Sequence, residues 1–356
     1  MIERIWGLAV SILFGSLVML SFLYYEIPDA LWWATGLVFF GGAIAFVIRR
    51  GMVGFVIRRL LEAVLVIWII ASLTFLLLRV LPGGPFDSEK ALPKEVIENL
   101  EKKYNLNAPL WDQYTAYISQ VAHGDLGQSY KYLSRDITSI IAESLPRSIQ
   151  LGVYALLISY LLGVPLGVIA GWKQNSPTDY LSMFTAIMGV SLPSFLIAPL
   201  FISLFAKKLG WFEPALWEGP SYYVLPMVVL GIRPAAVIAR LTRASVLEVV
   251  HSDFIRTAKA KGLDSRTILF KHVLRNSLIP VLSLSGPLVA AILTGSFVIE
   301  QIFAISGVAK HLVLSVGNRD YPLILGTTLV FSVMLVLANL ITDLIIAIVD
   351  PRVKMQ

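Results

Sequence analysis

Long uninterrupted apolar runs are the feature of this sequence that most limits its fold. Several runs reach the roughly 20 residues that a helix needs to cross the hydrocarbon core of a bilayer. Only helices and closed barrels satisfy their backbone hydrogen bonds there, and these runs lack the alternating pattern of barrel strands. The chain is also only 15% charged, against about a quarter for a soluble domain. We therefore expect an all-α, polytopic transmembrane helical bundle.

Hydropathy places eight candidate spans along the chain. They cover roughly residues 7–24, 31–48, 60–81, 149–171, 181–205, 223–239, 278–303 and 323–349. The first run is not followed by a signal-peptide cleavage pattern, so we expect it to be a retained helix.

The charges of the short linkers predict the orientation. The linker after the second span carries four basic residues: Arg49, Arg50, Arg58 and Arg59. The charged residues of the first linker, 25–30, are both acidic. The segment 240–275 carries eight Lys and Arg against three acids. Positively charged loops stay in the cytoplasm, so both termini are expected inside, in a multi-pass protein of the cell inner membrane. Four basic residues fall outside, against the rule: Lys207, Lys208, Lys310 and Arg319.

One external segment, 82–146, is long, polar and mixed in charge. Pro93 and Pro109 each stand where a helix can begin, and His123 with Gly124 marks the end of the second helix. We expect a small cap that packs on the outer ends of the spans. Direct contact with a partner protein is the alternative.

Charged residues inside the predicted spans are costly and are usually paired or functional. Glu62 lies one turn from Arg58, which predicts a local ion pair. Arg233 lies near the middle of its span, and Asp343 lies about 10 Å inside the cytoplasmic end. Pairing with a neighbouring helix is the simpler interpretation of both, and a place on a translocation path is the alternative.

Three glycines of the fourth span, Gly163, Gly167 and Gly171, form two overlapping GxxxG units. Such units allow a second helix to approach closely. They predict a helix–helix contact and no further function.

The loop 244–280 is far more polar than its surroundings, yet it keeps helical periodicity. Leu247, Val250, Phe254 and Ala258 follow helical spacing. Gly262 can adopt the left-handed conformation that ends a helix, and Asp264 or Ser265 can cap the next one. The pattern predicts a helix, a sharp turn and a second helix. A basic loop held at lipid headgroups is the alternative from charge alone.

Particular residues of this loop carry a family resemblance. They are Arg256-Thr257-Ala258, Ala260-Lys261-Gly262, His272, Arg275-Asn276 and Pro280. In this order they resemble the EAA loop of ABC importer permeases, in the form found in the oligopeptide and dipeptide (peptide/nickel) branch. The general loop begins Glu-Ala-Ala, so residues 256–258 depart from the general form and fit the branch.

Segments elsewhere resemble the same branch, in order from about residue 55 to the C-terminus. They are Arg58-Arg59-Leu60-Leu61, Pro82-Gly83-Gly84-Pro85, Gly124-Asp125-Leu126-Gly127-Gln128-Ser129, Glu300-Gln301-Ile302-Phe303 and Arg319-Asp320-Tyr321-Pro322. The resemblance implies a type I ABC importer permease fold. It implies a permease domain over 51–356 with about six core spans, preceded by a two-helix extension over 1–50.

The function implied by the resemblance is that of a permease subunit in an ATP-driven, binding-protein-dependent importer working by alternating access. Di- and oligopeptides are the expected substrates; nickel, glutathione and other peptide-like compounds are the alternatives within the branch. The implied partners are a second permease chain, two cytoplasmic ATPase subunits and an external solute-binding protein.

The loop is then expected to couple the ATPase to the membrane helices. The residues expected to do so are Phe254, Arg256, Thr257, Ala258, Lys259, Lys261, Gly262 and Asp264. Because the sequence has no GxxxxGK[ST] segment, it lacks a phosphate-binding P-loop, and ATP hydrolysis is assigned to the partners. We expect no catalytic residue, cofactor, metal or nucleic acid: the four histidines are scattered and cysteine is absent.

Three other kinds of membrane protein compete with this interpretation. A stand-alone secondary carrier should show two similar halves, which the sequence does not. An intramembrane metalloprotease would need HExxH, which is also missing. A non-catalytic scaffold would leave the motifs of the loop unexplained.

Overall fold

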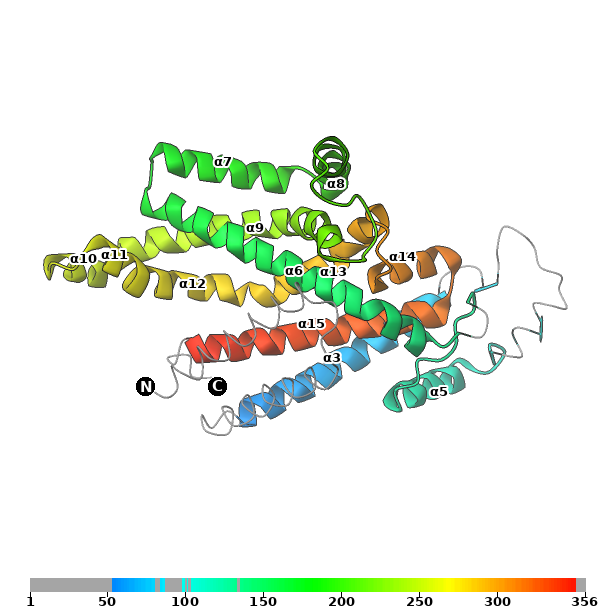
Figure 1. Cartoon of the computed structure of the whole chain (residues 1–356). Coiled ribbons are helices and arrows are strands. Elements are labelled where there is room, and N and C mark those ends of the chain that lie inside the picture. Colours follow the sequence, from blue (N-terminus) through cyan, green and yellow to red (C-terminus); the bar gives the residue numbers. More distant parts are fainter. Residues whose placement is uncertain are drawn as a thin grey trace, which may run out of the picture.

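The computed structural model describes residues 53–80, 84–86, 98–99, 101, 104–132 and 135–349. Within these residues the regular elements are helices, and the one isolated bridge joins Gln128 to Asp136. The helices form an elongated bundle (Figure 1). The predicted all-α fold is therefore confirmed, whereas the two spans predicted within residues 1–50 lie outside the described residues.

Four helices are long and apolar enough to cross a membrane: α3 (Val53–Val80), α6 (Ile137–Trp172), α9 (Pro220–Val250) and α15 (Tyr321–Val349). They confirm the third, fourth, sixth and eighth predicted spans. Helix α6 begins well before residue 149, where the apolar run begins. Its first turns form because Ile137, Ile140 and Ile141 are buried in a cluster with residues of α14 and α15.

The predicted fifth span is two helices rather than one. Helix α7 (Pro177–Ser191) and α8 (Ser194–Phe201), which continues as the π-helix η1 (Ile202–Lys208), meet at an angle of 103°. The break falls at the Leu192-Pro193 pair, and a proline disfavours helical geometry in the residue before it. Leu192 is accordingly extended, with ψ 122°.

The predicted seventh span is also divided. Helix α12 (Leu274–Ser283) and α13 (Ser285–Ile302) meet at Leu284. Before α12 lie α11 (Ser265–Thr267) and the π-helix η2 (Ile268–Val273), which together with α12 make one helical run. π-Helical turns are rare and are frequently found at functional sites.

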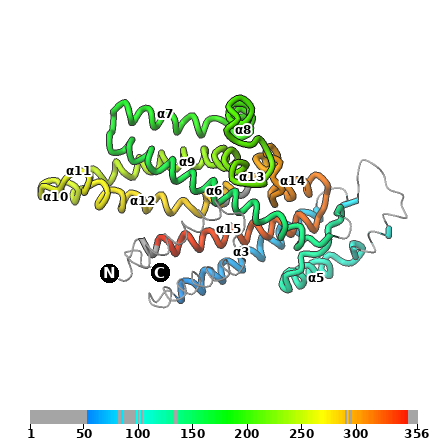
Figure 2. The backbone as a smooth tube through the Cα atoms, in the orientation of Figure 1, coloured from blue at the N-terminus to red at the C-terminus, as the bar shows by residue number. Residues whose placement is uncertain are grey.

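Helices α6 and α9 make the most extensive contact among the described helices, and they lie side by side in both views (Figures 1 and 2). A Cβ added at Gly167 would lie 2.4 Å from the Ala239 carbonyl oxygen, and one added at Gly163 would lie 2.5 Å from that of Ala235. From the other side, a Cβ at Gly231 would lie 2.7 Å from the Ala155 carbonyl oxygen. The GxxxG prediction is confirmed, because the backbones meet where a side chain would separate them.

The bundle has two distinct ends (Figure 2). One end carries α10 (Asp253–Ala260) and α11. The opposite end carries α14 (Val308–Asn318) and α5 (Leu110–Ala122). Helix α5 begins after Pro109 and ends at His123, followed by Gly124 at φ +76°, as predicted. Pro93 lies outside the described residues.

Candidate functional site

The loop that carries the family motifs reverses the chain at one end of the bundle. Helix α9 ends at Val250, α10 follows after Ser252, and Gly262 then takes φ +77°. No atom lies within 4 Å of the place of a Cβ on Gly262, so its backbone conformation, and not crowding, favours glycine. The predicted order of helix, left-handed turn and helix is present; we call residues 252–264 the hook.

Asp264 begins the helix after the turn. Its side chain accepts a hydrogen bond from the Thr267 backbone N–H at 3.1 Å. Thr267, through its side chain and backbone, holds the pKa of the Asp264 carboxyl below its usual value. The cap is therefore charged at neutral pH, and its contribution to stability is present above the unfolded-state pKa and is lost as the pH falls through the folded-state pKa.

The hook is fixed to the bundle through two buried residues of α10. Ile255 and Ala258 lie three residues apart and pack with Val246, Ile268 and Val273, from α9 and η2. Ala258 therefore belongs to the chain's own core. Phe254, expected on the same face as Ala258, is 47% exposed.

The outer surface of the hook combines apolar and basic side chains. Arg256, Lys259 and Lys261 are exposed, as is Thr257, whose hydroxyl donates to the Asp253 carbonyl oxygen at 3.0 Å. Besides Phe254, two further large apolar side chains are exposed on this loop: Leu263 at 40% and Phe270 at 67%. The sequence analysis did not predict either one, although a large apolar residue in a polar loop is a signal that could have identified them. Apolar side chains rimmed by charge suit contact with another protein.

A buried ion pair supports the helix that leads into the hook. Arg243 of α9 donates two hydrogen bonds to Asp179 of α7, at 2.7 and 2.8 Å. The Asp179 side chain is only 3% exposed, and it also accepts from the Asn175 backbone N–H at 3.0 Å. Such two-point pairing fixes orientation as well as distance. The sequence offered one signal for it, an acid three residues after the helix-capping Ser176.

At the opposite end, Glu300 of α13 joins three helices, because its partners lie on α6 and α14. Glu300 is fully buried and accepts hydrogen bonds from the Ser148 hydroxyl at 2.8 Å and the Lys310 backbone N–H at 2.9 Å. Ser148 in turn accepts from the Val308 backbone N–H at 2.8 Å. The first N–H groups of a helix have no partner within it, and Ser148 and Glu300 accept from two of those in α14, Val308 and Lys310. A Cβ on Gly307 would lie 2.3 Å from the Glu300 carboxyl carbon.

The Asp320 motif ties the segment before α6 to α15. Asp320 is buried, and its carboxylate accepts a hydrogen bond from the Ser129 hydroxyl and another from the Tyr130 backbone N–H at 3.1 Å. It also accepts from the Leu323 backbone N–H at 3.4 Å, in the first turn of α15. Two family-like motifs, far apart in sequence, thus meet in one contact that positions helices.

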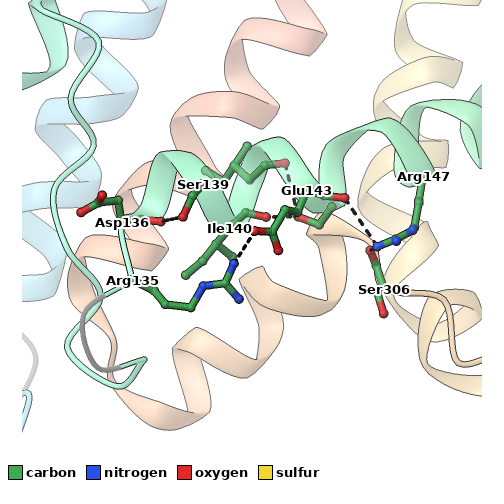
Figure 3. Close-up of polar contacts among 9 residues, drawn as sticks. Arg135, Asp136, Ser139, Ile140, Glu143, Arg147 and Ser306 are labelled. Carbon is green, nitrogen blue, oxygen red and sulfur yellow. Dashed lines mark hydrogen bonds and ion pairs between the residues drawn. The ribbon is translucent and has the colours of Figure 1, made fainter.

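The first turns of α6 carry exposed polar contacts at the same end (Figure 3). Arg135 pairs with Glu143 at 2.6 Å, and Arg147 donates to the Ser306 carbonyl oxygen at 3.4 Å. The Ser139 hydroxyl donates to the Asp136 carbonyl oxygen at 2.7 Å. Because Arg135 and Glu143 are about half exposed, their pair contributes little to stability.

The two residues expected on a translocation path do not meet. Asp343 pairs with Arg59 of α3 at 2.8 Å, and the same arginine reaches Glu62 at 3.3 Å. The predicted pair of Glu62 with Arg58 is present at 3.0 Å. Arg233 is exposed on α9 and has no ion pair with any residue that the structure describes.

Known proteins resemble this chain over most of its length. Residues 52–152 match a family model described as the N-terminal part of a binding-protein-dependent transport system membrane component, and residues 163–355 match the binding-protein-dependent transport system inner membrane component model. The oligopeptide transport system permease protein OppB of Salmonella typhimurium is 44% identical over 305 residues, which are 85% of this chain and all of that protein. The dipeptide transport system permease protein DppB of Bacillus subtilis is 44% identical over 305 residues, which are 86% of this chain and 99% of that protein.

A solved structure, of inward facing conformations of the MetNI methionine ABC transporter, shares the fold. Its TM-score is 0.50 at 18% identity, and the match covers 60% of this chain and 98% of that chain. This likeness supports the permease fold, with no bearing on the substrate.

Proposed function

This chain belongs to the family of binding-protein-dependent transport system inner membrane components, and we propose that it forms one half of the membrane path of an ATP-driven importer for di- and oligopeptides. The observation that carries the substrate class is the 44% identity to oligopeptide and dipeptide permeases over essentially their full length. The chain is a membrane-embedded permease subunit.

We place the hook on the cytoplasmic side, as the docking element for an ATPase subunit. The linker charges support this orientation, with both termini inside. Exposed Phe254 suits an apolar groove on the partner, while Arg256, Lys259 and Lys261 provide charges at its rim. Ile255 and Ala258 attach the hook to α9, so movement of the ATPase would reach the membrane helices directly.

The remaining partners follow from the same proposal. ATP hydrolysis takes place on two separate cytoplasmic subunits, a second, different permease chain completes the path, and an external binding protein delivers the substrate. Alternating access then results from rigid-body movement of the helices about a central site.

We further propose that residues 1–50 are an extension of the permease domain, 51–356. What supports this is that the family match begins at residue 52. The relatives also correspond, over their whole length, to 305 residues of this chain.

Uptake by the reconstituted complex tests the function. The permease, its second chain, its ATPases and its binding protein are placed in lipid vesicles, and entry of a labelled tripeptide is measured. Uptake should require both ATP and loaded binding protein. Uptake of nickel or glutathione without uptake of any peptide would reassign the substrate, and uptake by this chain alone would indicate a stand-alone carrier.

A further inference from the structure

One face of α9 is left uncovered within the part of the chain that the structure describes. Helix α6 packs closely against the opposite side, α7 covers one flank and α12 the other. After its first turn, α9 exposes only four residues. They are Arg233, Arg240, Ala244 and Glu248.

The exposed residues lie on one side of the helix, and half-buried Val237 lies between the two arginines on the same side. Arg233, Val237, Arg240 and Ala244 are separated by four, three and four residues, the spacing of a single helical face. We call these four residues the arginine stripe. Its two guanidinium groups arise about 10 Å apart along the helix axis, at 1.5 Å per residue.

The charge of the arginine stripe does not suit lipid. Arg243, on the neighbouring flank, is bound by Asp179, whereas neither Arg233 nor Arg240 forms an ion pair with a described residue. A guanidinium at membrane depth requires water, an anion or another partner. The other faces of α9 are covered by protein. A partner for these two arginines would therefore have to approach the uncovered face from outside the chain.

We propose that the arginine stripe lines the substrate path and binds the carboxylate of the passing substrate. This rests on the proposed importer function, in which a peptide brings a terminal carboxylate through the membrane. Arginine binds carboxylates in a two-point geometry. Arg233 near the middle of the span and Arg240 near its cytoplasmic end offer two successive contacts along this face.

A single cysteine in place of Val237 tests the proposal, because this position lies between both arginines and the change leaves them in place. The chain has no cysteine of its own. In the nucleotide-free reconstituted complex, whose other chains are made cysteine-free, Val237→Cys is treated with an anionic or a cationic methanethiosulfonate reagent. The ratio of the two rates is divided by the ratio at Ser119→Cys, an exposed residue of α5. We expect about a fivefold preference for the anionic reagent. Replacing both arginines by Gln should abolish it.

Protection by substrate gives the second measurement. A millimolar tripeptide with a free carboxylate should slow the labelling of the Val237→Cys complex about threefold, and its C-terminal amide should not. If neither reagent labels the introduced thiol, lipid or the second permease covers the face and the proposal is wrong. Labelling without charge preference, or equal protection by both peptides, also overturns it. Labelling does not depend on uptake, so anionic preference without peptide protection would support a cationic path while contradicting the peptide substrate.

Discussion

The buried acids of this chain act as connectors between helices. Asp179 binds Arg243 across two helices, Glu300 and Ser148 accept from two N–H groups in the first turn of α14, and Asp320 binds Tyr130 in the segment before α6. An unpaired buried charge is costly, so removing one partner of such a contact destabilises the fold more than removing an exposed pair does.

The Asp179–Arg243 pair provides a test at this scale. Asp179→Asn keeps the shape but loses the charge, and we expect the purified complex to lose about 2–3 kcal/mol of stability. The measurement is the thermal unfolding midpoint in detergent. Arg256→Gln is the matched control, because its partner Asp253 is 97% exposed and lies at 3.5 Å. Equal effects of the two changes would show that burial of the pair is unimportant.

The sequence predicted single residues well where their chemistry is local. The left-handed Gly262, the capping Asp264 and the Glu62–Arg58 pair each depend on neighbours within a few residues. The partners of Asp179 and Glu300 could not be predicted, because each pair joins residues that meet only when the helices reach their final register.

The elements were predicted less evenly. Phe254 and Ala258 were placed on one face by continuing the periodicity of α9, but the chain breaks at His251–Ser252. The helical register therefore restarts in α10, and Ile255 takes the inward place. Pro193 was visible in the apolar run, but hydropathy measures only how apolar a segment is. It therefore could not show that the helix axis changes direction at Leu192.

The α6–α9 contact is the element most sensitive to side-chain size. Gly167→Val would push side-chain atoms into the Ala239 backbone, and overpacking of this kind costs about 1–3 kcal/mol or more. We expect loss of the assembled complex, measured by size-exclusion chromatography. Gly54→Val on α3 is the control, since nothing lies within 4 Å of that residue. Normal assembly of Gly167→Val would mean that the two helices can separate without consequence.

Substitutions at Gly262 test whether the left-handed turn of the hook is needed for coupling. Gly262→Val places a branched side chain at positive φ, at a cost of about 1–2 kcal/mol, and should remove the stimulation of ATP hydrolysis by loaded binding protein. Gly262→Asn tolerates the left-handed region and should largely retain it.

Gly317→Val, at an open site with ordinary φ, should leave stimulation unchanged. Stimulated ATPase activity in lipid is the readout. If the Gly262→Val complex kept its stimulation by loaded binding protein, the hook would be an ordinary surface loop without a role in coupling.

For the whole molecule, the orientation can be read by labelling single cysteines in intact cells. Ser119→Cys on α5 should react with a membrane-impermeant thiol reagent added outside, and Ser265→Cys beside the hook should react only after the cells are opened. The reverse pattern would place the hook on the outer side and remove the proposed ATPase contact.

The proposed division of the chain predicts that residues 1–50 are dispensable. A protein beginning at Met52 should assemble with its partners and take up peptide at a rate within about twofold of the full chain. Failure to assemble at normal expression would place the extension within the core.

The glycine contact between α6 and α9 has a mechanical consequence. Helix α9 alone is about 46 Å long, at 1.5 Å per residue, and its backbone is pressed against that of α6, so the pair behaves as one stiff lever. The hook is fixed to one end of this lever, and Ser148 of α6 holds α14 near the other. A rotation of about 10° around one end would displace the other by about 8 Å over this length. A larger side chain at the glycines would separate the two helices, so that a movement applied at the hook would reach α14 only in part.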